Sequence, residues 1–213
     1  MFRHLTWRNA KTVVVPFFWV PATVIFLNDN VAEVTRVHGE SMEPSLSPIA
    51  KATGIRDSVL FKKWNVQEDI QRGDVVLFHS PYAPERMGTK RVIATEGDTV
   101  VLDPRRRPSN RASGADVPES LSWDMCKRKA FIPEGHVWVE GDNWRDSRDS
   151  NWYGPISRSL ILGKAVTVTA PWDRFGTKPW EAFKNKTKVI RGDLRQGDEE
   201  WKIWESMGPS KPL

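Results

Sequence analysis

Residues 90–98 read KRVIATEGD, with an apolar centre at residues 92–94 followed by a Glu-Gly-Asp turn. A β-branched run that ends in turn residues is typical of a short strand. Other runs of this kind cover residues 34–38, 74–79, 99–102, 136–140 and 162–170. No long amphipathic helical pattern lies between residues 30 and 170. The sequence therefore predicts a mainly β domain.

The composition limits the classes of protein that the chain can belong to. A length of 213 residues suits one ordinary domain with additions, and 39% hydrophobic with 28% charged residues is typical of a globular protein. The net charge of +5 alone would allow a nucleic-acid partner, but the basic residues are scattered and no nucleic-acid-binding motif accompanies them. We therefore expect no nucleic acid. The single cysteine excludes an internal disulfide and any multi-cysteine metal site.

The N-terminal segment has the pattern of a membrane anchor. A basic leader without acidic residues (1–11) precedes an uncharged run rich in Val and Phe (12–28). As a helix the run would reach about 25 Å, slightly less than a hydrocarbon core of about 30 Å, and Pro16 and Pro21 would kink it. A cleaved secretory signal would need a small-x-small site after the run, which is missing, and a buried core helix would leave the basic leader unexplained. We predict an uncleaved transmembrane anchor that leaves the leader in the matrix or cytosol.

The rest of the chain divides into a domain, which contains an insertion, and a tail. We expect the β-rich domain over residues 29–175, with a surface insertion or long hairpin near 103–129 that is rich in Arg, Pro, Ser and Gly. A polar tail follows over residues 176–213. Its pattern is compatible with a peripheral helix or with an extension, and the sequence leaves both open.

A candidate nucleophile lies just after the anchor. Residues 37–46 read VHGESMEPSL, which places Ser41 in a glycine-containing turn. A serine hydroxyl needs a nearby base to take its proton. Lys90 could be that base only in its neutral form, so its pKa must lie well below the usual value of about 10.4. Burial against apolar surface lowers the pKa of a lysine in this way.

A histidine-based mechanism is the alternative for Ser41. Glu43 stands where a Gly-x-Ser-x-Gly elbow would need its last glycine. A Ser-His-Asp triad could draw on His38, His79 or His136, but none of them has a recognisable triad setting. Lysine is therefore the expected base.

A third stretch supplies groups that could support the lysine. Residues 141–155 read GDNWRDSRDSNWYGP. Ser147 could hydrogen-bond the amine without adding charge. Asp149 must not pair directly with the amine, since a carboxylate would stabilise the ammonium form; we expect it to pair with Arg145 or Arg148, or to fix the loop.

In this order and spacing the three stretches resemble the conserved boxes of type I signal peptidases, which are membrane-bound Ser/Lys proteases. They are similar in particular to the subunit 2 branch of the mitochondrial inner membrane peptidases, over residues 13–175. The resemblance implies a signal-peptidase-like β domain behind a single N-terminal transmembrane helix. It also implies that Ser41 is the nucleophile and Lys90 the general base.

The resemblance extends to supporting residues, with two departures from bacterial members. It implies that Ser147 and Asp149 lie near the lysine and that Gly39 and Met42 flank the nucleophile. Gly39 stands where many bacterial members have a serine whose hydroxyl contributes to the oxyanion hole. Bacterial members also often have arginine at the position of Asn151, which favours the mitochondrial branch.

The implied function is a serine endopeptidase that removes N-terminal sorting presequences from proteins delivered to the mitochondrial intermembrane space. It needs no metal or organic cofactor. Its implied partners are precursor proteins with presequences, a paralogous catalytic subunit in a hetero-oligomeric complex, and the lipid bilayer. It would cross the inner membrane once, with the catalytic domain facing the intermembrane space. The alternatives are a bacterial-type or other organellar signal peptidase, or a catalytically silent membrane-tethered scaffold.

Overall fold

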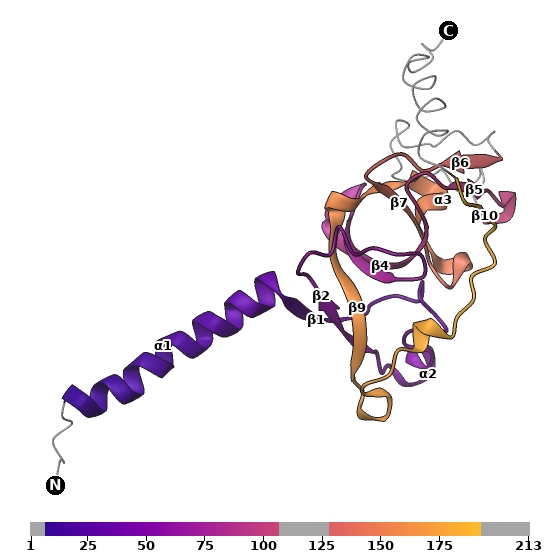
Figure 1. The fold of residues 1–213 in the computed structure, drawn as a ribbon. Helices are drawn as coiled ribbons and strands as arrows, with labels where there is room; N and C mark the ends of the chain where they lie inside the picture. Colours follow the sequence, from indigo (N-terminus) through magenta and orange to yellow (C-terminus); the bar gives the residue numbers. More distant parts are fainter. Residues whose placement is uncertain (1–6, 107–127, 193–213) are drawn as a thin grey trace.

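The computed structural model of the protein describes residues 7–106 and 128–192 (Figure 1). A seven-stranded antiparallel sheet has the order β1-β2-β9-β3-β4-β7-β8. Its strands are β1 (Ala32–Arg36), β2 (Ser58–Lys62), β3 (Val75–Ser80), β4 (Ala83–Thr95), β7 (His136–Glu140), β8 (Ile156–Ser157) and β9 (Ile161–Ala170). A three-stranded sheet of order β10-β5-β6 contains β5 (Thr99–Val101), β6 (Lys129–Phe131) and β10 (Val189–Ile190). The predicted mainly β class is confirmed.

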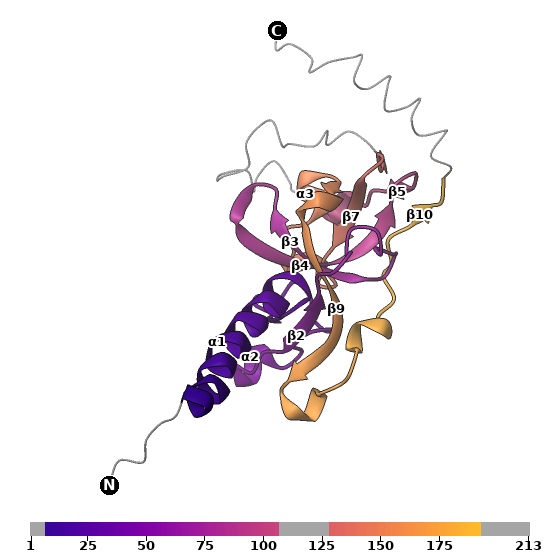
Figure 2. The ribbon, with the colours of Figure 1, turned by 60° about the vertical axis from the view of Figure 1, so that its left-hand side comes forward.

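Within residues 7–106 and 128–192 the helices are few and, apart from the first, short. The α-helices are α1 (Trp7–Asn30), α2 (Ala50–Thr53) and α3 (Ser150–Tyr153). Single 3-10 turns are η1 (Pro104–Arg106), η3 (Trp144–Asp146), η4 (Arg158–Leu160), η5 (Trp172–Arg174) and η6 (Pro179–Glu181). In both views α1 leaves one end of the domain and the three-stranded sheet lies at the other end (Figure 1 and Figure 2).

Strand β4 is apolar at its C-terminal end because it lies between two cores. Val92 packs with the cluster around Phe78 and Val139, whereas Ile93 packs with the cluster around Trp138. Since successive side chains of a strand point to opposite faces, both faces need apolar residues here. This arrangement explains why residues 92–94 form a continuous apolar run.

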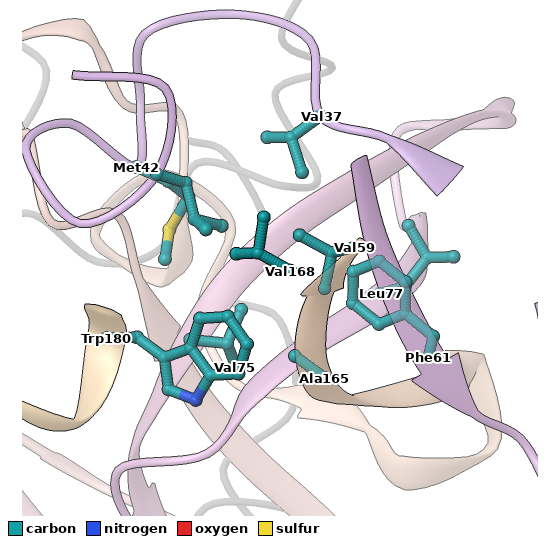
Figure 3. Packing of buried hydrophobic residues seen from close by; sticks show 10 residues of the cluster. Val37, Met42, Val59, Phe61, Val75, Leu77, Ala165, Val168 and Trp180 are labelled. Atoms are coloured by element: carbon teal, nitrogen blue, oxygen red, sulfur yellow. The ribbon is translucent and has the colours of Figure 1, made fainter. Parts of the chain in front are cut away.

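A further core lies beneath the N-terminal part of the domain. Val59 and Phe61 of β2 pack there against Val75 of β3 and Val168 of β9 (Figure 3). Met42 enters the same cluster from the loop that follows β1. The loop that carries Ser41 is thus fixed to the sheet by an apolar side chain.

The helix predicted over residues 12–28 is present as part of α1, which contacts the domain at β1. The described part of its surface is apolar and exposed; for example, Trp19 is 69% exposed. Among the described residues, no helix has both the length and the hydrophobicity that a membrane crossing requires.

The segment after β9 belongs to the packed domain as far as the structure describes it. Trp180 is buried in the core that contains Met42, and β10 pairs with β5. The described part of the predicted tail, residues 176–192, is therefore neither a peripheral helix nor a detached extension. The remaining parts of the leader, the insertion and the tail, residues 1–6, 107–127 and 193–213, lie outside the described residues.

Candidate active site

Ser41 lies in a tight loop between β1 and α2. Met42 and Leu46, both 1% exposed, hold this loop in the core, and the Leu46 N–H donates to the Met42 carbonyl oxygen at 2.9 Å. Gly39, two residues before Ser41, has a φ of +81°. The loop therefore holds Ser41 half-buried at the domain surface. The buried side chain of Met42 supports Ser41 by fixing the loop to the core.

Lys90 belongs to β4 and lies opposite Ser41. Its register partner is Val76 of β3, and only 7% of the residue is exposed. Its Nζ lies 2.5 Å from Ser41 Oγ, within hydrogen-bonding distance, although 49 residues separate the two in the sequence. The structure thus brings together the two residues that the sequence nominated as nucleophile and base.

The electrostatic surroundings of Lys90 favour the neutral amine. Burial lowers the pKa of Lys90 from 10.5 to about 8, because desolvation disfavours the ammonium form. The carboxylates of Asp149 and Asp142 act in the opposite direction but do not offset it. At mildly alkaline pH a large share of Lys90 can therefore accept a proton.

Ser147 and Asp149 lie beside this pair but contact each other. Ser147 Oγ donates to Asp149 Oδ2 at 2.6 Å, and the Gly141 N–H donates to the same oxygen at 3.0 Å. Asp149 Oδ1 accepts from the Asn151 N–H at 3.1 Å and so caps α3. The Ser147 hydroxyl, which was predicted to bond the Lys90 amine, therefore donates to the Asp149 carboxylate instead.

The sequence left two roles open for Asp149, pairing with Arg145 or Arg148 or fixing the loop. Its hydrogen bonds fix the loop around residues 141–151, and the described ion pairs include none with Arg145 or Arg148. Those guanidinium groups lie over the rings of Trp144, at 4.7 Å, and Trp152, at 5.3 Å.

Gly141 is a contact point between this loop and the nucleophile. A Cβ added there would lie 2.5 Å from the Ser41 carbonyl oxygen and 2.6 Å from Ser147 Cβ. The same loop also binds the backbone of Ser41, since the Asn143 N–H donates to the Ser41 carbonyl oxygen at 3.0 Å. Sequence reasoning missed this glycine, although its place beside Asp142 in the third stretch could have indicated it.

We expect Gly141→Ala to reduce peptide cleavage by about 100-fold or more, because its methyl group must displace Ser41 or Ser147, and a shift of about 1 Å can cost that much. The free energy of unfolding should fall by about 1–3 kcal/mol. Turnover and thermal unfolding of the same preparation measure the two effects. Gly176→Ala is the control for lost stability, because its φ of +77° strains an alanine by a similar free energy while no atom lies within 4 Å of the added Cβ. Equal activity of the two variants would contradict the contact.

Gly39→Ala should affect stability more than chemistry. The left-handed backbone disfavours alanine by about 1–2 kcal/mol, but no atom lies within 4 Å of the added Cβ. Activity per folded molecule should therefore stay near that of the parent protein, as measured by turnover normalised to the folded fraction. A folded but inactive variant would mean that substrate approaches the backbone of Gly39 closely.

A buried ion pair joins the three stretches. Arg91, next to Lys90 and 3% exposed, donates from Nε to Asp142 Oδ1 and from Nη2 to Asp142 Oδ2, both at 2.7 Å. Ser45 of the nucleophile loop donates to Asp142 Oδ2 at 2.5 Å. Arg91 Nη1 reaches the Trp180 carbonyl oxygen at 2.9 Å. This pair was not predicted from the sequence, although both residues lie within the recognised stretches.

A second ion pair holds the nucleophile loop from the other side. Arg174 Nη1 donates to Asp57 Oδ2 at 2.6 Å, and Arg174 Nη2 donates to the Ser45 carbonyl oxygen at 3.0 Å. The Ser47 N–H donates to Asp57 Oδ2 at 2.7 Å. Two arginines thus converge on the short segment after Ser41, which limits how far the loop can move.

The histidines that sequence reasoning kept as alternatives have local partners. His38, His79 and His136 each use Nδ1 to contact a nearby backbone carbonyl, of Arg36, Pro84 and Glu134 respectively, at 2.8 Å. Among the described residues, no hydrogen bond connects any of these rings to Ser41.

A free strand edge leads to Lys90. Strand β4 pairs with β3 from Ala83 to Arg91, whereas β7 pairs with the other edge of β4 only from Arg91 to Thr95. Within the described chain, residues 83–89 therefore have one unpaired edge. An extended peptide could add there by main-chain hydrogen bonds.

Comparisons with known proteins identify a family and several relatives. The family model described as "Signal peptidase, peptidase S26" matches residues 10–170. Mitochondrial inner membrane protease subunit 2 of Schizosaccharomyces pombe is 36% identical over 191 residues, which cover 90% of this chain and 92% of that protein. The mouse subunit 2 is 37% identical, with 86% of this chain and 89% of that protein covered. The mouse subunit 1 is 34% identical, covering 68% and 74%.

Proposed function

The chain belongs to the S26 family of signal peptidases, and from this premise we propose that it is a membrane-anchored serine endopeptidase that removes N-terminal sorting presequences. In this proposal Ser41 is the nucleophile and Lys90 is the general base. The observation that carries it is the 2.5 Å approach of the buried Lys90 Nζ to Ser41 Oγ.

The proposed reaction is acyl transfer in two steps. The neutral Lys90 amine takes the hydroxyl proton of Ser41 while Oγ attacks the scissile carbonyl carbon. The resulting ammonium gives that proton to the leaving amine, and the substrate acyl group remains on Ser41 as an ester. A water molecule, deprotonated by Lys90, then hydrolyses the ester and regenerates the hydroxyl. The Ser41 backbone N–H and a further donor stabilise the oxyanion in both steps.

In the proposed complex the substrate lies extended along the free edge of β4. Main-chain hydrogen bonds to residues 83–89 would hold the presequence and deliver the scissile bond to Ser41, with small pockets that accept small residues near the cut. The unpaired edge within the described chain, ending at Lys90, supports this placement.

The proposed location is the mitochondrial inner membrane. The relatives are named as subunits of a mitochondrial inner membrane protease, which supports a multi-subunit complex with a paralogous catalytic subunit. Although the described residues include no helix long and apolar enough to cross a membrane, we propose that the uncharged run 12–28, which forms part of α1, is the anchor. Its exposed apolar side chains at Trp19, Val24 and Phe26 favour lipid over water. The positive-inside tendency then directs the catalytic domain to the intermembrane space.

Cleavage of a presequence-bearing precursor by the isolated native complex tests the proposed activity. We expect the complex that contains the intact chain to cleave and the complex with Ser41→Ala to lose that cleavage, with both accumulating normally. Because the proposed partner subunit is also catalytic, the precursor must be one whose cleavage requires this chain. Unchanged cleavage in the Ser41→Ala complex would instead support the catalytically silent scaffold.

The proposed topology is tested by protease protection. In mitochondria with ruptured outer membranes, added protease should digest the domain after Asn30. Protection of the domain until the inner membrane is also opened would reverse the proposed orientation.

A further inference from the structure

Glu140 is a buried carboxylate directly beside the candidate active site. It is the last residue of β7, is 1% exposed, and precedes Gly141, which packs against Ser41. A buried charge is costly unless it is paired and hydrogen-bonded. The proposed reaction gives Glu140 no part, so its retention in the core calls for another explanation.

Five side-chain donors converge on the Glu140 carboxylate. Oε2 accepts from Arg106 Nη1 at 2.8 Å, Thr187 Oγ1 at 2.6 Å and Asn185 Nδ2 at 3.3 Å. Oε1 accepts from Trp138 Nε1 at 3.0 Å and Asn151 Nδ2 at 3.2 Å. The Oε2 donors come from the segments that flank the three-stranded sheet, whereas Asn151 belongs to the site loop.

Asn151 connects Glu140 to Asp149. Its Nδ2 donates to Glu140 Oε1 and also to Asp149 Oδ1, the latter at 3.0 Å. Because the other oxygen of Asp149 is taken by Ser147 and Gly141, the whole carboxylate is held within the loop. Among the ion pairs of the described residues, none joins Asp149 to Lys90.

We propose that Glu140 and Asn151 are positioning residues, which together hold the Asp149 carboxylate in the loop and away from the Lys90 amine. Arg106, Asn185 and Thr187 hold Glu140 in turn, so that the segment before β10 supports the site. The inference rests on the proposed role of Lys90. It explains why a carboxylate can lie this close to a lysine base without forming an ion pair with it.

Two substitutions break this connection at different points. Asn151→Ala removes the bridging amide. Glu140→Gln keeps the shape, but its amide oxygen should face the three Oε2 donors, which leaves its NH₂ group facing the donors of Asn151 and Trp138. In Asn151→Ala the Asp149 carboxylate keeps its bonds from Ser147 Oγ, the Gly141 N–H and the backbone N–H of residue 151, but it loses the side-chain bond to Oδ1. In Glu140→Gln the facing NH₂ group displaces the Asn151 amide and weakens the same bond. In both variants Asp149 is held less tightly and can move toward the ammonium of Lys90. Asp142, the other carboxylate acting on Lys90, stays held by Arg91 and Ser45.

The test is the titration of the Lys90 side chain in the full-length protein in detergent, followed by NMR of isotope-labelled lysine and assigned with Lys90→Ala. The parent midpoint should lie near pH 8. We expect Asn151→Ala and Glu140→Gln to raise it by about one unit, because an approaching carboxylate stabilises the ammonium. Cleavage at neutral pH should then fall about tenfold with the neutral fraction.

Two controls separate positioning from simple loss of stability. Asp98→Asn breaks another buried carboxylate–arginine pair, with Arg72, that has no link to the site loop, so it should leave the midpoint unchanged. In an Asp149→Asn background, Asn151→Ala should no longer shift the midpoint. A midpoint that stays unchanged in Asn151→Ala and Glu140→Gln, or a shift that persists without the Asp149 charge, would overturn the inference. The titration does not depend on cleavage. If the midpoints shift as expected but the protein cleaves no presequence, the inference stands and the proposed function is contradicted.

Discussion

We expect the Lys90→Arg protein to cleave presequence substrates about 10⁴-fold more slowly than the parent protein, as slowly as Lys90→Ala. Arginine keeps the positive charge but stays protonated at physiological pH, so it cannot take the Ser41 proton. Its guanidinium is also larger than the ammonium that fits 2.5 Å from Ser41 Oγ. The measurement is turnover of a purified precursor by each variant, at matched amounts of folded protein.

Arg91→Lys is the matched control on the neighbouring residue, because it changes the same strand without removing the candidate base. It should retain more activity than Lys90→Arg, although it weakens the bidentate pair with Asp142. Substantial turnover by Lys90→Arg would remove Lys90 as general base and return attention to His38, His79 and His136.

Asp142→Asn should lower the free energy of unfolding by about 3–5 kcal/mol, because it leaves the Arg91 guanidinium buried without its counter-charge. Total stabilities of domains are about 5–15 kcal/mol, so this loss is a large share of the total and the midpoint of thermal unfolding should fall. The same change disturbs Ser45 and the nucleophile loop. Thermal unfolding of the full-length protein in detergent measures the loss.

The double variant Arg91→Met with Asp142→Leu should be less destabilised than Asp142→Asn, because it removes both buried charges together. Glu181→Gln, in an exposed pair with Lys178, should change stability little. If Asp142→Asn were as stable as the double variant, the unpaired Arg91 charge would not be costly. The ion pair would then not be what holds the stretches together.

The strand pattern was readable from the sequence where burial repeats regularly. Residues 136–140 were predicted as a strand and form β7, and the run at 162–170 lies within β9. Strand β2 was missed because its apolar part is only Val59 to Phe61 and no Gly or Pro turn residue follows it, unlike the predicted strands. The short strands β8 and β10 carry almost no pattern of their own and depend on pairing with distant segments.

The site was predictable as far as its chemistry follows from local sequence. Ser41 and Lys90 could be nominated because their stretches resemble, in order and spacing, those of type I signal peptidases. The contacts of Gly141, Arg91 and Glu140 could not, because their partners lie far away in the chain, such as Asp142 for Arg91 at a separation of 51 residues. The same limit applies to Ser147, whose hydroxyl could have bonded the amine but bonds Asp149.

The pH dependence of Ser41 acylation tests the Ser/Lys dyad most directly. The full-length protein is treated with a serine-directed acylating probe across a range of pH, and the modified residue is identified by mass spectrometry. The pKa of about 8 for Lys90 predicts that labelling of Ser41 rises with pH through a midpoint near 8, as the amine becomes neutral, and that Lys90→Arg is not labelled. Labelling of another residue, or a midpoint near 6.5 as for an ordinary histidine, would contradict the dyad.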